Sequence, residues 1–261
     1  FTFETNEIDK INYRIAISFV SIENAKENLK NEEKHLTFEE YQRETSKEWD
    51  KYLSTIKIKS KNEDRIKQFY THFYHSLIHP NIVSDVNGEY MGADFKVHKT
   101  KENREQYSSF SVWDTYRTQG QLIAMLFPKK SSDMMQSLVD FAEQAGGYGR
   151  WILANIETGI MQGDPTPILI SNSYAFGGDD FDLETAYRYM KKGALIPRLY
   201  SQKQEIRPYL EEYINNGHTF ASMSLEYASS DFAIAQFALN AVANQEDYKL
   251  SLIHISEPTR Q

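Results

Sequence analysis

Helical periodicity dominates the chain from residue 63 onward. Apolar side chains at intervals of three and four form one face of a first helix, at Ile66, Phe69, Tyr70, Phe73 and Leu77. His79-Pro80 is expected to end this helix, because the residue before a proline avoids helical backbone angles. Similar patterns recur at 111–127, 131–145, 165–176, 182–193, 203–215 and 224–244, separated by clusters of Gly, Pro and Asp. Such helices, with short loops and no strands between them, predict a mainly α fold of the toroid or bundle type.

The segment before residue 63 has a different character. Apolar residues occupy the odd positions of 11–19, and this alternation predicts a half-buried strand whose partner strands are encoded upstream. Thr37, followed three residues later by Glu40, predicts the start of a helix over 37–56. This order indicates the end of a β region, then a connector, then a helical region.

An irregular stretch, residues 81–98, follows the first amphipathic helix. It predicts a hairpin that turns at Asn87-Gly88, a pair that favours tight turns. Its alternating acids do not follow the spacing of an EF-hand calcium loop. We therefore expect a turn with satisfied side chains rather than a metal site.

Charge and residue usage exclude several classes of protein. The chain has 29 Lys and Arg against 37 Asp and Glu, a net charge of −8, and lacks the basic face that nucleic-acid binding requires. The absence of cysteine excludes disulfides and thiolate metal sites. No apolar run approaches the ~18 residues that span a membrane, and the histidines lack zinc-site spacing. Aromatic residues make up 13%, which suits a sugar-binding cleft and a helical core equally.

The densest cluster of chemically useful side chains is Trp113, Asp114 and Arg117. The indole offers a stacking face for a sugar ring, and the carboxylate can accept from two sugar hydroxyls. Arg117 lies three residues after Asp114, on the same face of the expected helix. The same residues also fit a helix N-terminus with an Asp–Arg pair and a buried Trp, and the pattern alone does not choose between these two interpretations.

Two further clusters carry carboxylates. Asn155 and Glu157 are two residues apart, so in an extended segment they would point the same way. Asp164 precedes a proline and is interpreted as a helix cap rather than a catalyst. Glu226 lies in the first turn of a helix that carries Asp231, where the helix dipole is by itself a sufficient reason for an acidic residue.

Four segments, in this order, resemble signature runs of glycoside hydrolase family 92. They are FYHSL through SDVNGEYMG over 73–92, SFSVWDTYR over 109–117, WILANIETGIMQGD over 151–164, and SLEYASSD over 224–231. The sequence departs from the family in two places. Ile152 stands where a Glu is common, and Ser229-Ser230 replaces a Tyr-Asp pair, which weakens a polar role at that point.

The resemblance implies an N-terminal β-sandwich followed by an (α/α)6 toroid. The chain would then hold the last strand of the sandwich in 1–35, a connector helix in 36–62, and the first part of the toroidal catalytic domain in 63–249. The implied activity is that of an exo-acting α-mannosidase, commonly α-1,2, which inverts configuration and binds calcium near the sugar. A mannose-containing glycan is the implied partner, and the implied location is secreted, periplasmic or on the bacterial cell surface. Roles in the substrate pocket carry over to Trp113, Asp114 and Arg117, and less directly to Glu157 and Glu226.

The catalytic carboxylates of the family have no counterpart here. The family's acid lies in a GNEP motif and its base in a GD-D motif, and neither occurs in this sequence. No residue is therefore assigned as acid or base, and the chain is expected to be an inactive piece of a longer enzyme. Residues 250–261 resemble translated sequencing-adapter read-through and are predicted to be a non-native tail. The alternatives are another (α/α)6 glycosidase or phosphorylase, or a non-catalytic glycan-binding module.

Overall fold

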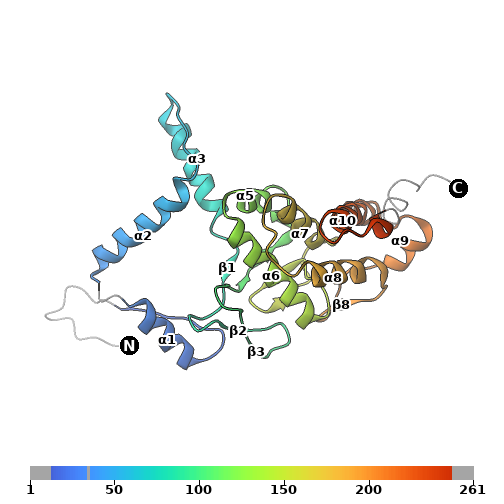
Figure 1. Cartoon of the computed structure of the whole chain (residues 1–261), viewed down its shortest axis with the longest axis horizontal. Helices are drawn as coiled ribbons and strands as arrows, with labels where there is room; N and C mark the ends of the chain where they lie inside the picture. Colours follow the sequence, from blue (N-terminus) through green and yellow to red (C-terminus); the bar gives the residue numbers. More distant parts are fainter. Residues whose placement is uncertain (1–12, 34–35, 249–261) are drawn as a thin grey trace.

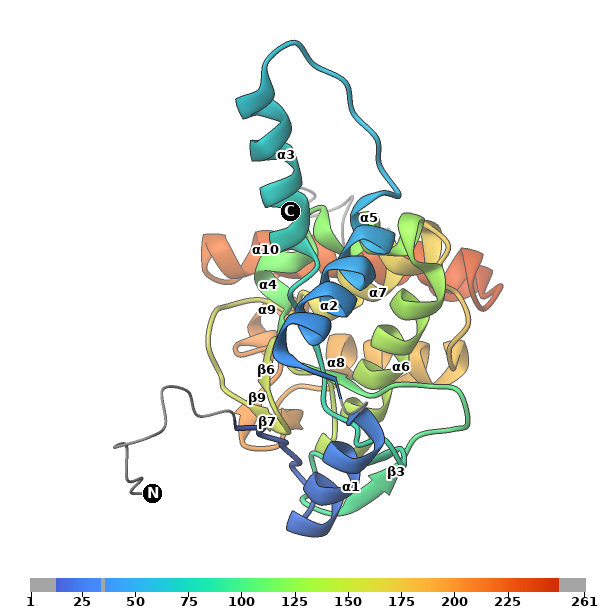
Figure 2. The same ribbon diagram turned by 90° about the vertical axis from the view of Figure 1, so that its left-hand side faces the viewer.

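The computed structural model describes residues 13–33 and 36–248. Three N-terminal helices, α1 (Ile22–Glu32), α2 (Phe38–Leu53) and α3 (Glu63–Ser76), extend away from a compact helical body that holds the rest of the chain (Figure 1). In the orthogonal view α3 projects beyond this body, and α2 passes in front of it (Figure 2). The predicted tail at 250–261 lies outside the described residues, as does part of the predicted β-sandwich segment.

Local capping explains where the N-terminal helices begin. The Thr37 hydroxyl accepts the Glu40 amide at 3.3 Å, and the Glu40 carboxylate accepts the Thr37 amide at 2.8 Å. This capping box confirms the predicted start of the connecting helix. At the start of α3, the Asn62 side chain alone provides the cap and accepts the Arg65 amide at 3.2 Å. As expected, α3 ends before His79-Pro80.

The predicted strand over 11–19 is not formed in the part of it that the structure describes. Residues 13–19 have no ladder partner among the described residues. Their alternating apolar side chains, Tyr13, Ile15, Ile17 and Phe19, are 52–80% exposed. A strand requires a neighbouring strand to pair its backbone groups, and periodicity alone does not supply one.

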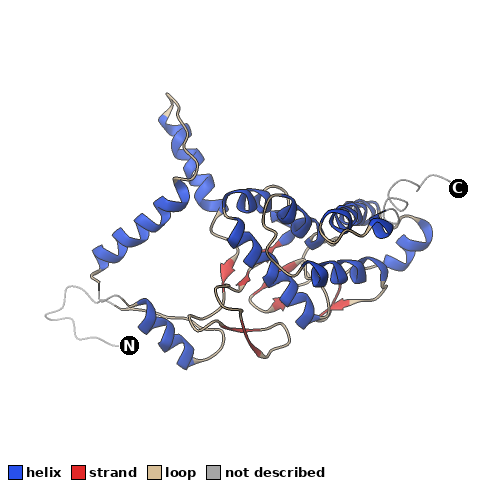
Figure 3. Ribbon diagram, in the orientation of Figure 1, coloured by secondary structure: helices blue, strands red, loops and turns tan. Residues whose placement is uncertain are grey.

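Short strands line one side of the helical body, where the sequence predicted none between the helices (Figure 3). The three-stranded sheet orders β5 (Phe110–Ser111), β6 (Trp151–Leu153) and β7 (Ile156–Glu157). Two-stranded pairs join β1 (Asn81–Ile82) to β4 (Tyr107–Ser108), and β8 (Tyr200–Ser201) to β9 (Gln204–Glu205). Strands of two or three residues carry no readable alternation, so the sequence could not predict them.

The predicted hairpin exists, but its turn is elsewhere. Strands β2 (Glu89–Met91) and β3 (Val97–Lys99) pair antiparallel and are joined through residues 92–96. Asn87-Gly88 lies in a separate tight turn before β2, in which the Gly88 amide donates to the Asp85 carbonyl at 2.8 Å. The central residues of this turn are Val86 and Asn87 rather than the expected pair Asn87 and Gly88, and the turn does not close the hairpin.

The helical body comprises α4 (Val112–Thr115), α5 (Gln119–Leu126), α6 (Pro128–Ala145), α7 (Thr166–Ala175), α8 (Leu183–Leu195), α9 (Leu210–Asn216) and α10 (Ala221–Asn240). The helix expected over 111–127 is broken in two because Thr118 takes a φ of +120°. The helix expected over 203–215 begins only at Leu210, because Pro208 disfavours helical angles at Arg207. The mainly α fold is otherwise confirmed.

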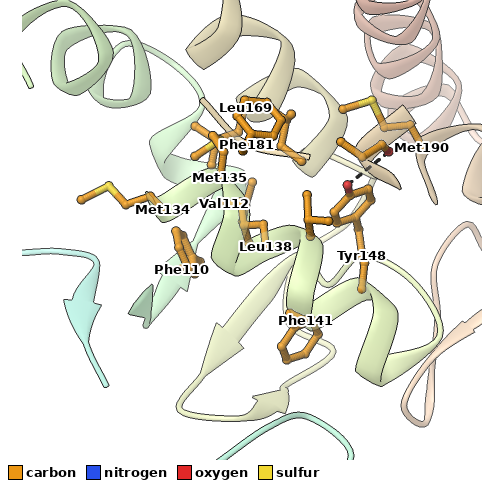
Figure 4. Close-up of a cluster of buried hydrophobic side chains, with 14 of the residues drawn as sticks. Phe110, Val112, Met134, Met135, Leu138, Phe141, Tyr148, Leu169, Phe181 and Met190 are labelled. Carbon is orange, nitrogen blue, oxygen red and sulfur yellow. Dashed lines mark hydrogen bonds between the residues drawn. The ribbon is translucent and has the colours of Figure 1, made fainter. Parts of the chain in front are cut away.

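The core is built around α6 and α7. Val112, Leu138, Val139 and Ile170 are fully buried in it. In the close-up, Met135 and Leu138 of α6 lie beside Val112 of α4, Leu169 of α7 and Phe181 of the segment that leads into α8 (Figure 4). The Tyr148 hydroxyl donates to the Ala186 carbonyl at 3.2 Å and ties the end of α6 to α8. The core includes Phe110 of β5 and Val112 of α4, and it thereby positions Trp113, the next residue of α4.

Candidate functional site

The three-stranded sheet brings two of the signature segments side by side. Ser111 of β5 pairs with Trp151 of β6, and Ile152 of β6 pairs with Glu157 of β7. The segment over 109–117 contributes β5, and the segment over 151–164 contributes β6 and β7. The two segments therefore lie side by side in one sheet. Sequence reasoning identified both segments but had no means of placing them together.

Helix α10 adds a third segment. The Trp113 indole Nε1 donates to Glu226 Oε1 at 3.2 Å, although the two residues are 113 positions apart in the chain. Gly163 also meets Glu226, since a Cβ on Gly163 would lie 2.8 Å from Glu226 Cβ. The segments that carry Trp113, Gly163 and Glu226 thus converge at one place.

Asp114 and Arg117 do not form the predicted pair on one helix face, because α4 is a single turn that ends at Thr115. Asp114 is exposed, and one of its oxygens, Oδ2, accepts a hydrogen bond from the Ser111 hydroxyl. The Arg117 guanidinium lies over the rings of Trp113 and Tyr116, 5.1 Å from each centroid. Arg117 therefore covers one face of the indole that we expected to stack on a sugar.

Glu157 lies beneath the surface of the site and is only 5% exposed. Its carboxylate accepts the Gly159 amide at 2.9 Å and the Trp151 amide at 3.2 Å. Burial raises the pKa of Glu157, and the two amide donors oppose that shift. Gly149 allows this close approach, because a Cβ there would lie 2.1 Å from Glu157 Oε2. In this structure Glu157 joins β6 to β7, and its contact with substrate stays a prediction.

Asp164 is not the helix cap that the sequence predicted. Pro165 occupies the cap position of α7, and Asp164 instead accepts a hydrogen bond from Arg207 Nε at 2.9 Å. Arg207 Nη1 donates to Asp231 at 2.6 Å. Ser230 is fully buried and its hydroxyl donates to the Asp164 carbonyl at 2.5 Å, so this position keeps a polar role despite its departure from the family. Arg207 was missed because nothing in its sequence neighbourhood marks it as a partner of two distant acids.

The turn at 85–89 is confirmed as one with satisfied side chains. The buried carboxylate of Asp85 accepts hydrogen bonds from Ser18, Asn24 and Asn28 at 2.7–2.8 Å. These contacts dock α1 onto the turn. A cleft of about 780 Å³ opens beside them, lined by residues of α1, the turn and 99–105. Trp113 and Asp114 do not line this cleft.

Within residues 13–33 and 36–248, no group of three or more His, Cys, Asp or Glu is arranged to hold a metal ion. The calcium ligands that the family resemblance implies are therefore not assigned to described residues. None of the described helices is both long and apolar enough to cross a membrane.

The family model of the glycosyl hydrolase family 92 catalytic domain matches residues 24–252. The chain belongs to glycosyl hydrolase family 92. A search of curated proteins finds no match.

Solved family 92 structures share the fold. An α-mannosidase of Bacteroides thetaiotaomicron is 27% identical with a TM-score of 0.81, over 91% of this chain and 32% of the other. The same enzyme has been solved in complex with mannoimidazole. An inverting mannosidase of that bacterium is 22% identical with a TM-score of 0.82, over 92% of this chain and 33% of the other, and shows the fold alone. The chain thus spans about a third of the length of these family 92 relatives.

Proposed function

We propose that the whole protein is an exo-acting α-mannosidase that releases terminal mannose from glycans with inversion. Membership of family 92 supports a glycoside hydrolase, and the solved relatives carry the name mannosidase. The single observation that carries the proposal is the hydrogen bond from Trp113, the neighbour of Asp114 in α4, to Glu226 of α10. The helices of the body would then belong to an (α/α)6 toroid, as the likeness to family 92 structures supports.

Asp114 is the residue best placed to bind sugar directly. Its carboxylate is exposed, and the Ser111 hydroxyl donates to Oδ2. Oδ1 has no hydrogen-bond partner among the described residues and can accept from sugar hydroxyls. Trp113 is oriented by its bond to Glu226, and Arg117 lies on one face of the indole. A pyranose ring would therefore contact the indole edge or its opposite face.

An inverting glycosidase also needs a pair of carboxyl groups that act on the glycosidic bond. One protonates the departing oxygen, and the other activates a water on the opposite side of the sugar ring, with the two about 6.5–9.5 Å apart. We assign neither role to a residue of this chain. The described residues would bind and orient the sugar, and the acid and base would come from the rest of the enzyme.

We also propose calcium dependence and an extracytoplasmic location (secreted, periplasmic or cell-surface) for the whole protein, on the family resemblance alone. The described residues form no acidic cluster suited to calcium. No step of the mechanism is therefore derived through the metal, and no ligand is named.

The test is mannose release from an α-mannoside by the full-length protein and its Asp114→Ala variant. Losing two hydrogen bonds from sugar to a charged group, at about 1.5 kcal/mol each, should lower kcat/KM about 100-fold. The matched control is Asp179→Ala, since Asp179 is an exposed acid in the loop between α7 and α8. Unchanged activity in Asp114→Ala would remove this residue from the site. Cleavage that requires phosphate would indicate a phosphorylase, and mannoside binding without cleavage would indicate a binding module.

A further inference from the structure

A buried ion network lies next to the Trp113–Glu226 contact, and the proposed function does not use it. The Arg207 side chain is 1% exposed and binds two carboxylates at once, Asp164 through Nε at 2.9 Å and Asp231 through Nη1 at 2.6 Å. The Tyr213 hydroxyl donates to the second oxygen of Asp231 at 3.3 Å. Although burial lowers the pKa of Arg207, the two carboxylates raise it by more, so the guanidinium stays charged.

Arg207 connects the two backbone segments that fix Glu226. Asp164 directly follows Gly163, which abuts the Glu226 side chain. Asp231 lies on α10, five residues after Glu226. Arg207 therefore links the loop that carries Gly163 to helix α10.

Contacts around Arg207 reinforce this link. The guanidinium lies 5.1 Å from the centroid of the fully buried Tyr227 ring, and the Tyr227 hydroxyl donates to the Pro208 carbonyl at 2.8 Å. The Ser230 hydroxyl donates to the Asp164 carbonyl at 2.5 Å, and its oxygen also lies 3.0 Å from the Glu226 carbonyl oxygen. The contacts of Tyr227 with Arg207 and Pro208, and the bond from Ser230 to Asp164, join these segments to the first half of α10.

We propose that Arg207 is a positioning residue for the sugar site, which fixes Glu226 where it accepts the Trp113 indole N–H. A planar guanidinium can bind two carboxylates in a fixed geometry, whereas an ammonium group is a point charge without that geometry. A buried ion pair adds little net stability compared with an apolar replacement. The network is accordingly explained better by the geometry that it imposes than by stability. The consequence for sugar binding rests on the proposed function, and the effect on Trp113 does not.

The test compares Arg207→Lys with a matched control, Arg104→Lys, in the full-length protein. Arg104 also bridges two aspartates, Asp133 at 3.0 Å and Asp180 at 3.1 Å, and neither is part of the site. The first readout is the indole N–H proton resonance of Trp113, assigned with Trp113→Phe. The second is the affinity for methyl α-mannoside, and melting temperatures show that each variant is folded.

Arg207→Lys is expected to move the Trp113 resonance toward its position in Glu226→Ala, and to weaken mannoside binding about 10-fold, the effect of one misplaced charged hydrogen bond. Arg104→Lys is expected to change neither. A wild-type Trp113 resonance in folded Arg207→Lys would overturn the proposal, as would an equal shift in Arg104→Lys. If Arg207→Lys does not fold, Arg207→Met combined with Asp164→Asn and Asp231→Asn removes the charges together, and the same two outcomes apply.

The two proposals fail in different ways. A shifted Trp113 resonance in a protein that binds no mannoside would refute the proposed function and leave the positioning role of Arg207 intact. Normal mannoside binding together with an unshifted resonance in Arg207→Lys would refute the positioning role alone.

Discussion

Gly163→Ala should damage the site through its contact with Glu226. Gly163 has a φ of +77°, and a left-handed backbone costs an L-residue about 1–2 kcal/mol. The added Cβ would also lie 2.8 Å from Glu226 Cβ, well inside contact distance. That atom is fixed to the backbone of α10 and cannot rotate away, so overpacking adds about 1–3 kcal/mol. The total destabilisation is about 2–5 kcal/mol, which lowers Tm by about 4–20 °C in a domain of this size.

Gly177→Ala separates the two effects. Gly177 has a φ of +105°, but the nearest atom to an added Cβ is the Ala124 carbonyl oxygen, at 3.9 Å. This control should cost only the backbone contribution, about 1–2 kcal/mol. The assay is thermal unfolding followed by circular dichroism, with mannoside affinity measured on the same samples. Equal losses of Tm in the two variants, or undiminished mannoside affinity in Gly163→Ala, would refute the packing argument.

Three further predictions concern other parts of the molecule. Burial raises the pKa of Glu157 above its ordinary 4.5, so its contribution to stability is present below pH 4.5 and is lost as pH rises through the raised pKa. The assay is urea unfolding of the parent protein and of Glu157→Gln at a series of pH values. The free energy of unfolding of the parent should fall relative to that of Glu157→Gln as pH rises above 4.5. A difference between the two proteins that does not change with pH would contradict this. Thr37→Ala removes the hydroxyl that accepts the Glu40 amide and leaves the backbone amide of residue 37 in place; it should destabilise α2 by about 1 kcal/mol, seen as faster amide exchange in its first turn. Leu138→Ala, at a fully buried position, should cost about 2–5 kcal/mol, and a loss under 1 kcal/mol would argue against the core assignment.

The sequence predicted those features that depend on nearby residues. Thr37 and Glu40 are three positions apart and form their capping box as expected. The helix from residue 63 and most of the later helices follow the spacing of their apolar residues. The breaks at Thr118 and before Leu210 were missed, because one unusual backbone angle or one proline interrupts a pattern that otherwise continues.

The site depends on contacts that no local pattern encodes. Trp113 and Glu226 were both chosen as candidates, yet their hydrogen bond joins residues 113 positions apart and depends on how α10 packs. Arg207 binds Asp164 and Asp231 across 43 and 24 positions. A single sequence shows the type of each side chain, and only the packing of the helices shows which side chains meet.

The most direct test of the central claim is proton NMR of the full-length protein acting on an α-mannoside. The account predicts that free mannose is released and that the β-anomer appears first, before mutarotation, as an inverting mechanism requires. An α-anomer as the first product would contradict inversion. Absence of any mannose release would contradict the proposed function itself.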